Sequence, residues 1–151
     1  MMYGIYWELV DRNDTNAIFR ILLSISDQKD ICWHVYDLDH LDEYYNALEN
    51  RILLKNEADV ALCRIQDVIS ICIKAYPISV KELIHGYNNY QTYQSFVSSP
   101  CILAFYCFDC VHQEVYSQNK SIIDLIYSSL QRIPTLNMRW INNPEDERTH
   151  F

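Results

Sequence analysis

The sequence predicts one α+β domain over residues 1–151, in which helices pack on a mixed or mainly antiparallel sheet. Three observations support this prediction. The chain has 151 residues, 50% of them apolar, and no proline-rich linker or internal repeat divides it. Strand-like and helix-like segments do not alternate regularly along it, and two junctions between strands are compatible with hairpins. A three-layer α/β arrangement is the alternative.

The N-terminal third is predicted to fold as a strand, a helix and a second strand. Residues 3–10, YGIYWELV, are rich in aromatic and β-branched side chains, as is typical of a strand. A helix then begins at Asp14 or Thr15, either of which can cap it. Its apolar residues recur with the spacing of one helical face: Ile18, Ile21, Leu22 and Ile25. Residues 31–36, ICWHVY, form the second predicted strand.

The middle of the chain predicts a helix that Asp39 caps, and then a strand. The apolar face of that helix consists of Leu41, Tyr44, Tyr45, Leu48 and Ile52. Residues 53–66 indicate neither a helix nor a strand. Residues 68–76, VISICIKAY, form a strand that ends at Pro77.

The C-terminal half predicts two helices around one central strand. Ser79 and Glu82 have capping-box spacing and start a helix. The apolar run and the following alternation over residues 101–116 predict a single strand. Ser121 and Asp124 form a second capping box and start the last helix. A short strand, NMRWIN, follows it.

Composition limits the function classes. The chain has only two glycines and no Gly-rich phosphate-binding motif, so we expect no nucleotide or other cofactor. Its net charge is -8 and its basic residues are scattered, so we expect no nucleic-acid partner. An acidic surface instead favours a basic protein partner.

The expected location is the cytoplasm, without membrane association. The N-terminus lacks a basic segment, a long apolar segment and a cleavage site, which together mark a secretory signal. The longest apolar run, CILAFYCF, is far shorter than the roughly 20 residues of a membrane span. In that compartment the six cysteines are expected to be reduced thiols.

Three cysteines and one histidine lie close together near the predicted central strand. Cys107 and Cys110 form a CxxC pair, and His112 follows. A zinc site normally needs four ligands, often from two such pairs, and there is no second pair. On a continuous strand Cys107 and Cys110 would also face opposite sides of the sheet. We therefore interpret these thiols as packing groups and expect no metal.

Acidic residues follow the second predicted strand: Asp37, Asp39, Asp42 and Glu43. A strand that ends in Asp-x-Asp is similar to the nucleophile motif of haloacid-dehalogenase-like phosphatases. The chain departs from that motif at Leu41, where Thr or Val is expected. Asp39 as a helix cap, with Asp42 and Glu43 in the first turn, is the structural interpretation. The enzymatic alternative is a small metal-dependent hydrolase that uses Asp37 and Asp39.

Tyrosine is unusually frequent, with 12 residues in this chain. Tyr87, Tyr90 and Tyr93 recur every third residue along a predicted helix. Their rings either cover the sheet or form a binding surface, because tyrosine is common among interface anchors. The binding surface that we predict combines these three with acidic residues and one more tyrosine: Asp37, Asp39, Asp42, Glu43 and Tyr44.

The C-terminal half resembles a family of small proteins of Bacillus-type bacteria that carries a domain of unknown function. The positions that carry the resemblance are Phe96, Ser99, Cys101, Asp109, Glu114, Tyr116, Asp146, Arg148 and Thr149. The resemblance implies lineage and compartment but no activity. It also draws attention to Asp109, which lies within the predicted apolar strand. We predict a buried polar cluster of Asp109, Glu114 and Arg148 that attaches the tail to the sheet.

These observations together predict a non-enzymatic protein-binding module of the immunity or inhibitor type. One small acidic domain, many tyrosines and no assembled catalytic motif support it. The hydrolase that uses Asp37 and Asp39 is the second hypothesis. A component whose only role is oligomeric assembly is the third.

Overall fold

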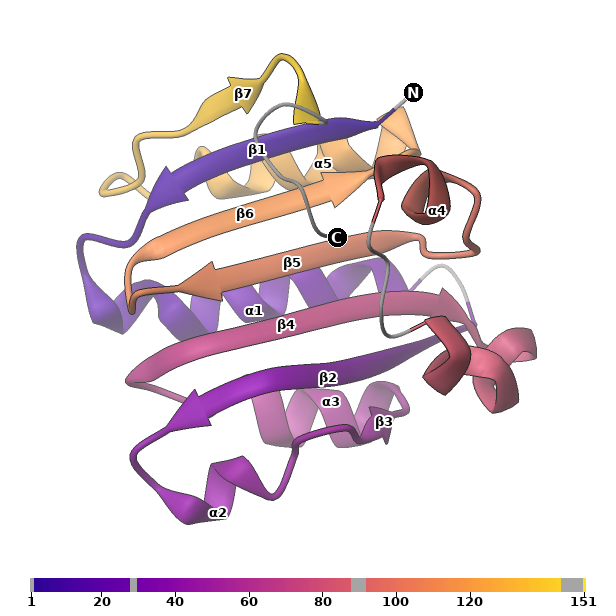
Figure 1. Ribbon diagram of the computed structural model, residues 1–151. Coiled ribbons are helices and arrows are strands. Elements are labelled where there is room, and N and C mark those ends of the chain that lie inside the picture. Colours follow the sequence, from indigo (N-terminus) through magenta and orange to yellow (C-terminus); the bar gives the residue numbers. More distant parts are fainter. Residues whose placement is uncertain (1, 28–29, 88–91, 145–150) are drawn as a thin grey trace.

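The structure, a computed structural model, describes residues 2–27, 30–87, 92–144 and 151. Its strands are β1 (Tyr3–Glu8), β2 (Ile31–His40), β3 (Ile52–Leu53), β4 (Val68–Pro77), β5 (Leu103–Phe108), β6 (His112–Ser117) and β7 (Arg139–Ile141). Within the described residues these strands form one sheet in the order β3-β2-β4-β5-β6-β1-β7, and all neighbours are antiparallel (Figure 1). The predicted α+β class is confirmed.

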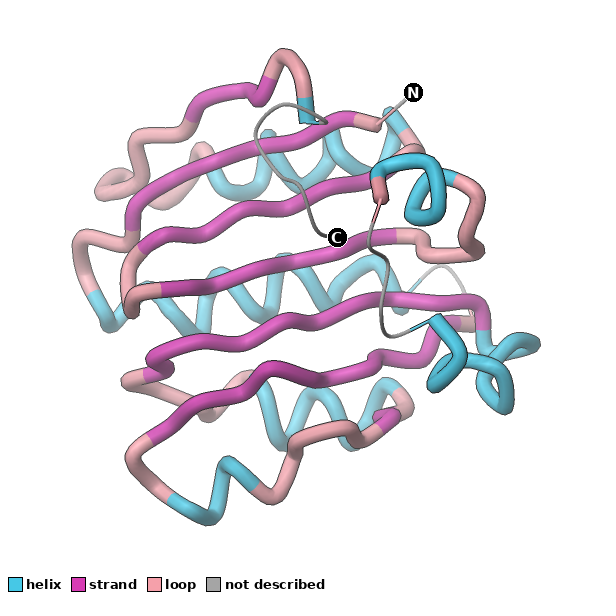
Figure 2. The backbone as a smooth tube through the Cα atoms, in the orientation of Figure 1, coloured by secondary structure: helices cyan, strands magenta, loops and turns pink. Residues whose placement is uncertain are grey.

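The helices divide between the two faces of the sheet. The α-helices are α1 (Thr15–Leu23), α2 (Glu43–Asn46), α3 (Lys55–Leu62), α4 (Tyr93–Val97) and α5 (Lys120–Leu130). The 3₁₀-helices are η1 (Arg12–Asp14), η2 (Ser24–Asp27) and η3 (Ile78–Tyr87). Helices α1, α3 and α5 cover one face, while η3 and α4 lie over part of the other (Figures 1 and 2).

The two faces differ in chemistry because successive strand residues point to opposite sides. On the helix-covered face, side chains such as Trp7, Ile73 and Phe105 build an apolar core. The opposite face, which we call the front face, is built mainly from aromatic and polar side chains. Its buried members include Cys32, His34, Tyr36, Cys72, Lys74, Tyr76, Tyr106, Glu114 and Tyr116.

The predicted single strand over residues 101–116 is wrong: the segment is a hairpin of β5 and β6. Asp109 and Cys110 form its turn, with φ of 51° and 68°. The turn lacks the glycine that usually marks positive φ, although Asp tolerates this conformation. β5 is apolar up to the turn and no glycine marks the reversal of the chain, so the sequence pattern conceals the turn.

The predicted helix that Asp39 caps is also wrong. β2 continues to His40, and Asp39 pairs with Ser70 of β4. Asp42 caps the helix instead, because its carboxylate accepts the backbone N–H of Tyr44 at 2.9 Å. The helix, α2, is one turn long, and Ile52 lies in β3.

The last helix begins earlier than its predicted capping box. The side chain of Asn119 accepts the backbone N–H of Ile122 at 3.2 Å and caps α5. Asp124 instead forms an ion pair with Lys120 at 2.8 Å. The strands predicted at residues 3–10, 31–36, 68–76 and 137–142 and the helix from Thr15 are present, with boundaries that differ by a few residues.

Candidate functional site

The five acidic-stretch residues predicted to bind a partner lie in one exposed segment. We call residues 37–46 the acidic loop. It comprises the last residues of β2, a short turn and α2, beyond one end of the sheet (Figure 1). All five side chains are exposed: Asp37, Asp39, Asp42, Glu43 and Tyr44.

A bulge in β2 begins the acidic loop. Asp37 has φ of 50°, and the pairing of β2 with β4 shifts register at this point. The carboxylate of Glu49 accepts the backbone N–H groups of Asp37 at 2.9 Å and Leu38 at 2.7 Å. The hydroxyl of Ser70 donates to the carbonyl oxygen of Asp37 at 3.1 Å. These bonds satisfy backbone groups that the sheet ladder leaves unpaired.

His40 and Asn46 hold the centre of the acidic loop. The Asn46 amide accepts the backbone N–H of His40 at 3.1 Å and donates to its carbonyl oxygen at 2.8 Å. The buried His40 ring accepts the backbone N–H of Asp42 at 2.8 Å through Nδ1. Its Nε2 contacts the carbonyl oxygen of Gln66 and therefore carries the proton, because a carbonyl only accepts. These hydrogen bonds hold the backbone of the loop in one conformation.

Two apolar side chains project from this rigid loop. Leu41 is 87% exposed and Tyr44 is 77% exposed. The Tyr44 ring packs edge-on against Tyr45 at 5.3 Å between ring centroids, and Tyr45 contacts the His40 ring at 4.7 Å.

The acidic loop also carries negative charge that the described part of the protein does not neutralise. The carboxylates of Asp37, Asp39 and Glu43 form no ion pair with a described residue. The Asp42 carboxylate is used as the cap of α2. The loop thus presents two exposed apolar side chains, Leu41 and Tyr44, among carboxylates.

A groove of about 370 Å³ lies beside Asp37, on the front face. Ser70, Tyr106 and Phe108 also line it. The exposed Phe108 ring stacks on His112 at 5.3 Å between centroids. Aromatic faces beside a carboxylate are a chemical environment that suits a lysine or arginine side chain.

The predicted tyrosine part of the surface is separate from the acidic loop. Tyr93 lies in α4, half-buried, with its ring 5.7 Å from that of Phe151. Because β2 and β4 are antiparallel, α2 and α4 follow opposite ends of the sheet (Figure 1). The side chain of Tyr87 and the whole of Tyr90 lie outside the described residues.

The predicted polar cluster does not form through Asp109. Asp109 lies in the hairpin turn and is exposed, which corrects its placement within a buried strand. Glu114 is buried on the front face, where the hydroxyl of Tyr116 donates to it at 2.7 Å. Arg148 lies outside the described residues.

Two basic side chains on the front face were not among the predicted site residues. His34 of β2 and Lys74 of β4 are neighbours in register, and both are fully buried. The Lys74 ammonium lies over the rings of Tyr36 and Phe96, at 5.1 and 5.3 Å from their centroids. A sequence signal existed, because each is a basic residue within a predicted strand that is otherwise mostly apolar.

Burial controls the protonation of the front face. Desolvation, with smaller contributions from His85 and Lys74, lowers the pKa of His34 to about 4. Burial raises the pKa of Cys101 to about 12 and that of Tyr36 above its usual value. At neutral pH these groups are therefore an uncharged imidazole, a thiol and a phenol.

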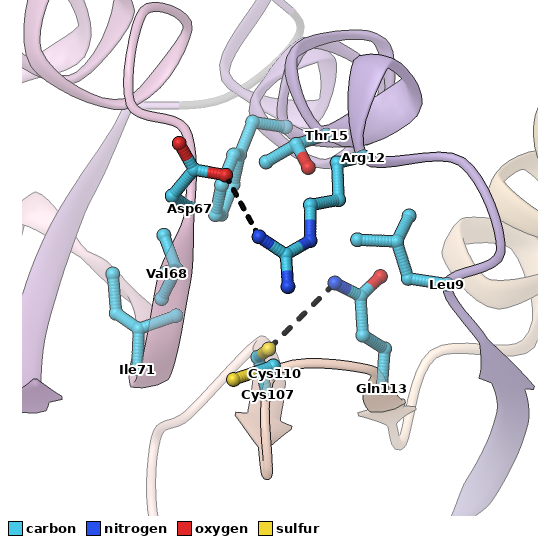
Figure 3. A pocket seen from close by; sticks show the side chains of 10 residues that line it. Leu9, Arg12, Thr15, Asp67, Val68, Ile71, Cys107, Cys110 and Gln113 are labelled. Carbon is cyan, nitrogen blue, oxygen red and sulfur yellow. Dashed lines mark hydrogen bonds and ion pairs between the residues drawn. The ribbon is translucent and has the colours of Figure 1, made fainter. Parts of the chain in front are cut away.

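Cys107 and Cys110 line the same small cavity, because Cys107 lies near the end of β5 and Cys110 lies in the hairpin turn that follows it (Figure 3). Its volume of about 10 Å³ holds at most about one water molecule. This corrects the expectation that the two face opposite sides of a continuous strand. Burial raises the pKa of Cys107 to about 11, so its sulfur is a thiol at neutral pH.

Polar contacts close this cavity on the helix-covered side (Figure 3). The Gln113 amide donates to Sγ of Cys107 at 3.7 Å and accepts Nε1–H of Trp7 at 2.6 Å. Arg12 and Asp67 form an ion pair at 3.2 Å near it. The arrangement satisfies buried polar atoms and leaves no room for a substrate.

The described residues contain no group of three or more His, Cys, Asp or Glu side chains placed to share a metal ion. The hydrolase hypothesis for Asp37 and Asp39 therefore stays a prediction without an assembled site in that part of the chain. No described helix has the length and apolar character needed to cross a bilayer.

Comparison with known proteins identifies the family. No curated protein and no solved structure is significantly similar to this chain. Residues 2–151 match one family, described as "Protein of unknown function (DUF2691)". The match extends over both halves of the sheet, including the N-terminal strand and the acidic loop. The chain therefore belongs to the DUF2691 family of proteins of unknown function.

Proposed function

We propose that this protein is a non-enzymatic protein-binding module of the immunity or inhibitor type. Its acidic loop binds a basic surface of the partner protein. The observation that carries the proposal is a pre-organised loop that exposes Leu41 and Tyr44 among carboxylates without counter-ions in the described chain.

The apolar anchors would supply most of the affinity. Tyrosine is enriched among residues whose truncation strongly weakens an interface, and burial of a Leu or Tyr side chain is favourable. The bonds that His40 and Asn46 make fix the backbone that carries both anchors. Binding therefore requires little ordering of the loop, which favours affinity.

The carboxylates would supply partner selection. With a net charge of -8, the protein attracts basic surfaces at long range and repels acidic ones. Asp37 lies at the edge of the 370 Å³ groove, whose aromatic wall suits a lysine or arginine from the partner. An inhibitor that masks a basic active site has this combination of features.

The proposed setting is the cytoplasm of a Bacillus-type bacterium. The resemblance of the C-terminal half supports the bacterial lineage. The described residues include all six cysteines, each of them a free thiol in the structure. Free thiols persist in a reducing compartment.

A capture experiment from host lysate with matched variants tests the proposal. The acidic loop variant is Asp37→Asn/Glu43→Gln, and the control Asp30→Asn/Glu82→Gln removes the same charge from exposed positions elsewhere. A partner should be retained by the wild type and the control at low salt, and retained less well at high salt, because salt screens the contribution of the carboxylates. The acidic loop variant should retain at least several-fold less of it.

A second arm separates apolar from electrostatic recognition. Leu41→Ala/Tyr44→Ala should lose the partner at every salt concentration, because it removes the anchors. A partner that binds both loop variants as well as the wild type would contradict the proposal. A rise in Tm with Mg²⁺ that disappears in Asp37→Asn would instead support the hydrolase.

A further inference from the structure

Another cavity lies between α2 and α3. Its charged lining residues are arginines, in contrast to the carboxylates of the acidic loop. It occupies about 410 Å³ between the α2 turn and α3, within the usual size range of small-molecule sites. It and the acidic loop share Tyr44 and Tyr45, but the features of the cavity do not depend on a protein partner.

The walls of this cavity are aromatic and aliphatic. Tyr44 and Tyr45 line it from α2, Leu48 from the following turn, and Val60 from α3. The Tyr45 ring is fixed by its contacts with His40 and Tyr44. Leu48 is buried, whereas Val60 is exposed at the rim. A planar ring can stack on the tyrosines and displace water from the aliphatic wall.

Two arginines provide the charge of the cavity. Arg51 and Arg64 line it, and no carboxylate is among its described lining residues. Arg51 contacts Glu57 at 3.4 Å, but both side chains are about half exposed, so this ion pair is weak. Arg64 forms no ion pair with a described residue. Their guanidinium groups are therefore available to a carboxylate, which they bind in bidentate geometry.

The negative net charge of the protein makes the two arginines in this cavity evidence for an anion site. At a net charge of -8 the long-range field repels anions, so an anion site needs cations in its own wall. We propose that the cavity between α2 and α3 binds a small aromatic carboxylate. Its ring lies against Tyr44, Tyr45 and Leu48, and its carboxylate lies between Arg51 and Arg64.

The probe for this site is 8-anilinonaphthalene-1-sulfonate, an aromatic anion whose fluorescence rises in apolar surroundings. The wild type should bind it, and benzoate should displace it. Benzamide, which has the same shape without the charge, should displace it at least about tenfold less well. Inorganic phosphate, which lacks a ring, should also compete poorly.

Matched variants locate the site. Arg51→Gln and Arg64→Gln should each weaken benzoate binding about tenfold, because each removes a charge-assisted hydrogen bond. Arg132→Gln removes an exposed arginine beyond α5 and should bind like the wild type. Amide resonances of Ala47, Val60 and Ala61 should shift when benzoate is added to the ¹⁵N-labelled wild type, which needs no variant to fold.

Three results would overturn the proposal. The first is equal competition by benzoate and benzamide, which would show that charge is not recognised. The second is phosphate competition as strong as that of benzoate, which would show that the ring is not recognised. The third is any result that places benzoate elsewhere, whether shifted amides remote from α2 and α3 or unchanged benzoate affinity in both arginine variants.

Discussion

Gly4 allows a tyrosine ring to lie flat on the sheet. Gly4 pairs with Tyr116 of β6 and Ile141 of β7, and an added Cβ would lie 2.7 Å from Cε1 of Tyr116. That distance is well below van der Waals contact, and Tyr116 is fully buried with little freedom to move. A side chain at position 4 therefore forces β1 or the ring to shift.

We predict that Gly4→Ala lowers the free energy of unfolding by about 1–3 kcal/mol, the usual cost of overpacking. Urea unfolding followed by circular dichroism measures it. Backbone propensity alone favours alanine over glycine in a strand by roughly 0.5–1 kcal/mol. An increase in stability would therefore show that the ring moves aside without cost.

His34 links stability to pH. Its pKa is about 4 in the folded protein, against about 6.5 when unfolded, so the unfolded state binds more protons between these values. The stability that the neutral ring contributes is present above pH 6.5 and is lost as the pH falls toward 4. The loss amounts to about 3 kcal/mol at most.

The expected measurement is the difference between wild type and His34→Phe at pH 7 and pH 4.5. Phenylalanine keeps a ring beside Tyr36 but cannot be protonated, so its variant should lose less stability on acidification. The subtraction cancels the titration of carboxylates common to both proteins. Parallel pH profiles for the two proteins would contradict the assignment.

At the scale of elements, the β5–β6 hairpin turns without glycine. Asp109 and Cys110 both have positive φ, which is unfavourable for most side chains and is normally occupied by Gly or Asn. Cys110 is only half-buried, so its side chain contributes little packing that offsets this cost.

We predict that Cys110→Gly stabilises the protein by about 0.5–1 kcal/mol, and that Cys110→Val destabilises it by more than that. Thermal unfolding of the two variants checks the sign. Asp109 has a similar φ, and Asp109→Gly should change stability less because Asp tolerates this region. Equal stability of the glycine and valine variants would show that the turn relaxes.

The side-chain amide of Asn46 holds the centre of the acidic loop through two hydrogen bonds to the backbone of His40. Asn46→Ala removes both bonds to the backbone of His40, so we expect a loss of about 1–2 kcal/mol and local opening of the loop. Hydrogen exchange of the amides over residues 38–46 should accelerate while that of β4 changes little. Asn13→Ala, an exposed position on η1, is the control. Unchanged exchange in the loop would contradict the role given to Asn46.

At the scale of the whole molecule, the sheet joins distant parts of the chain. β1, the first strand, lies between β6 and β7, and the helix-covered core extends from β1 to β2 without interruption. Neither half of the sheet has a core of its own. The protein should therefore unfold as one cooperative unit.

The three tryptophans report on this cooperativity because they lie in β1, β2 and β7. We propose three variants, each of which keeps one tryptophan (Trp7, Trp33 or Trp140) and has Phe at the other two positions. We expect that no part of the sheet around the remaining tryptophan unfolds at a lower denaturant concentration than the rest of the protein. In each variant the fluorescence and circular dichroism midpoints should coincide. If the fluorescence midpoint of the Trp140 variant lay at a clearly lower denaturant concentration than the other midpoints, the β7 edge would open independently.

The sequence by itself determined the α+β class, most strands and the acidic loop. Strands and long helices follow from side-chain periodicity, which is local. The acidic loop was predictable because its five candidate binding residues lie within eight positions of the sequence and therefore in one segment of any fold: Asp37, Asp39, Asp42, Glu43 and Tyr44. The hydrophobic signal of a strand could not show where the chain reverses, and the β5–β6 turn was therefore missed.

Only the tertiary structure decided which distant residues share a site. Antiparallel pairing places Tyr93 at the opposite end of the sheet from Tyr44, and it places Lys74 beside His34. The tertiary structure brings Arg64, which follows α3, to the same cavity as Arg51. Strand order and register depend on contacts between residues far apart along the chain, and local pattern carries no information about those contacts.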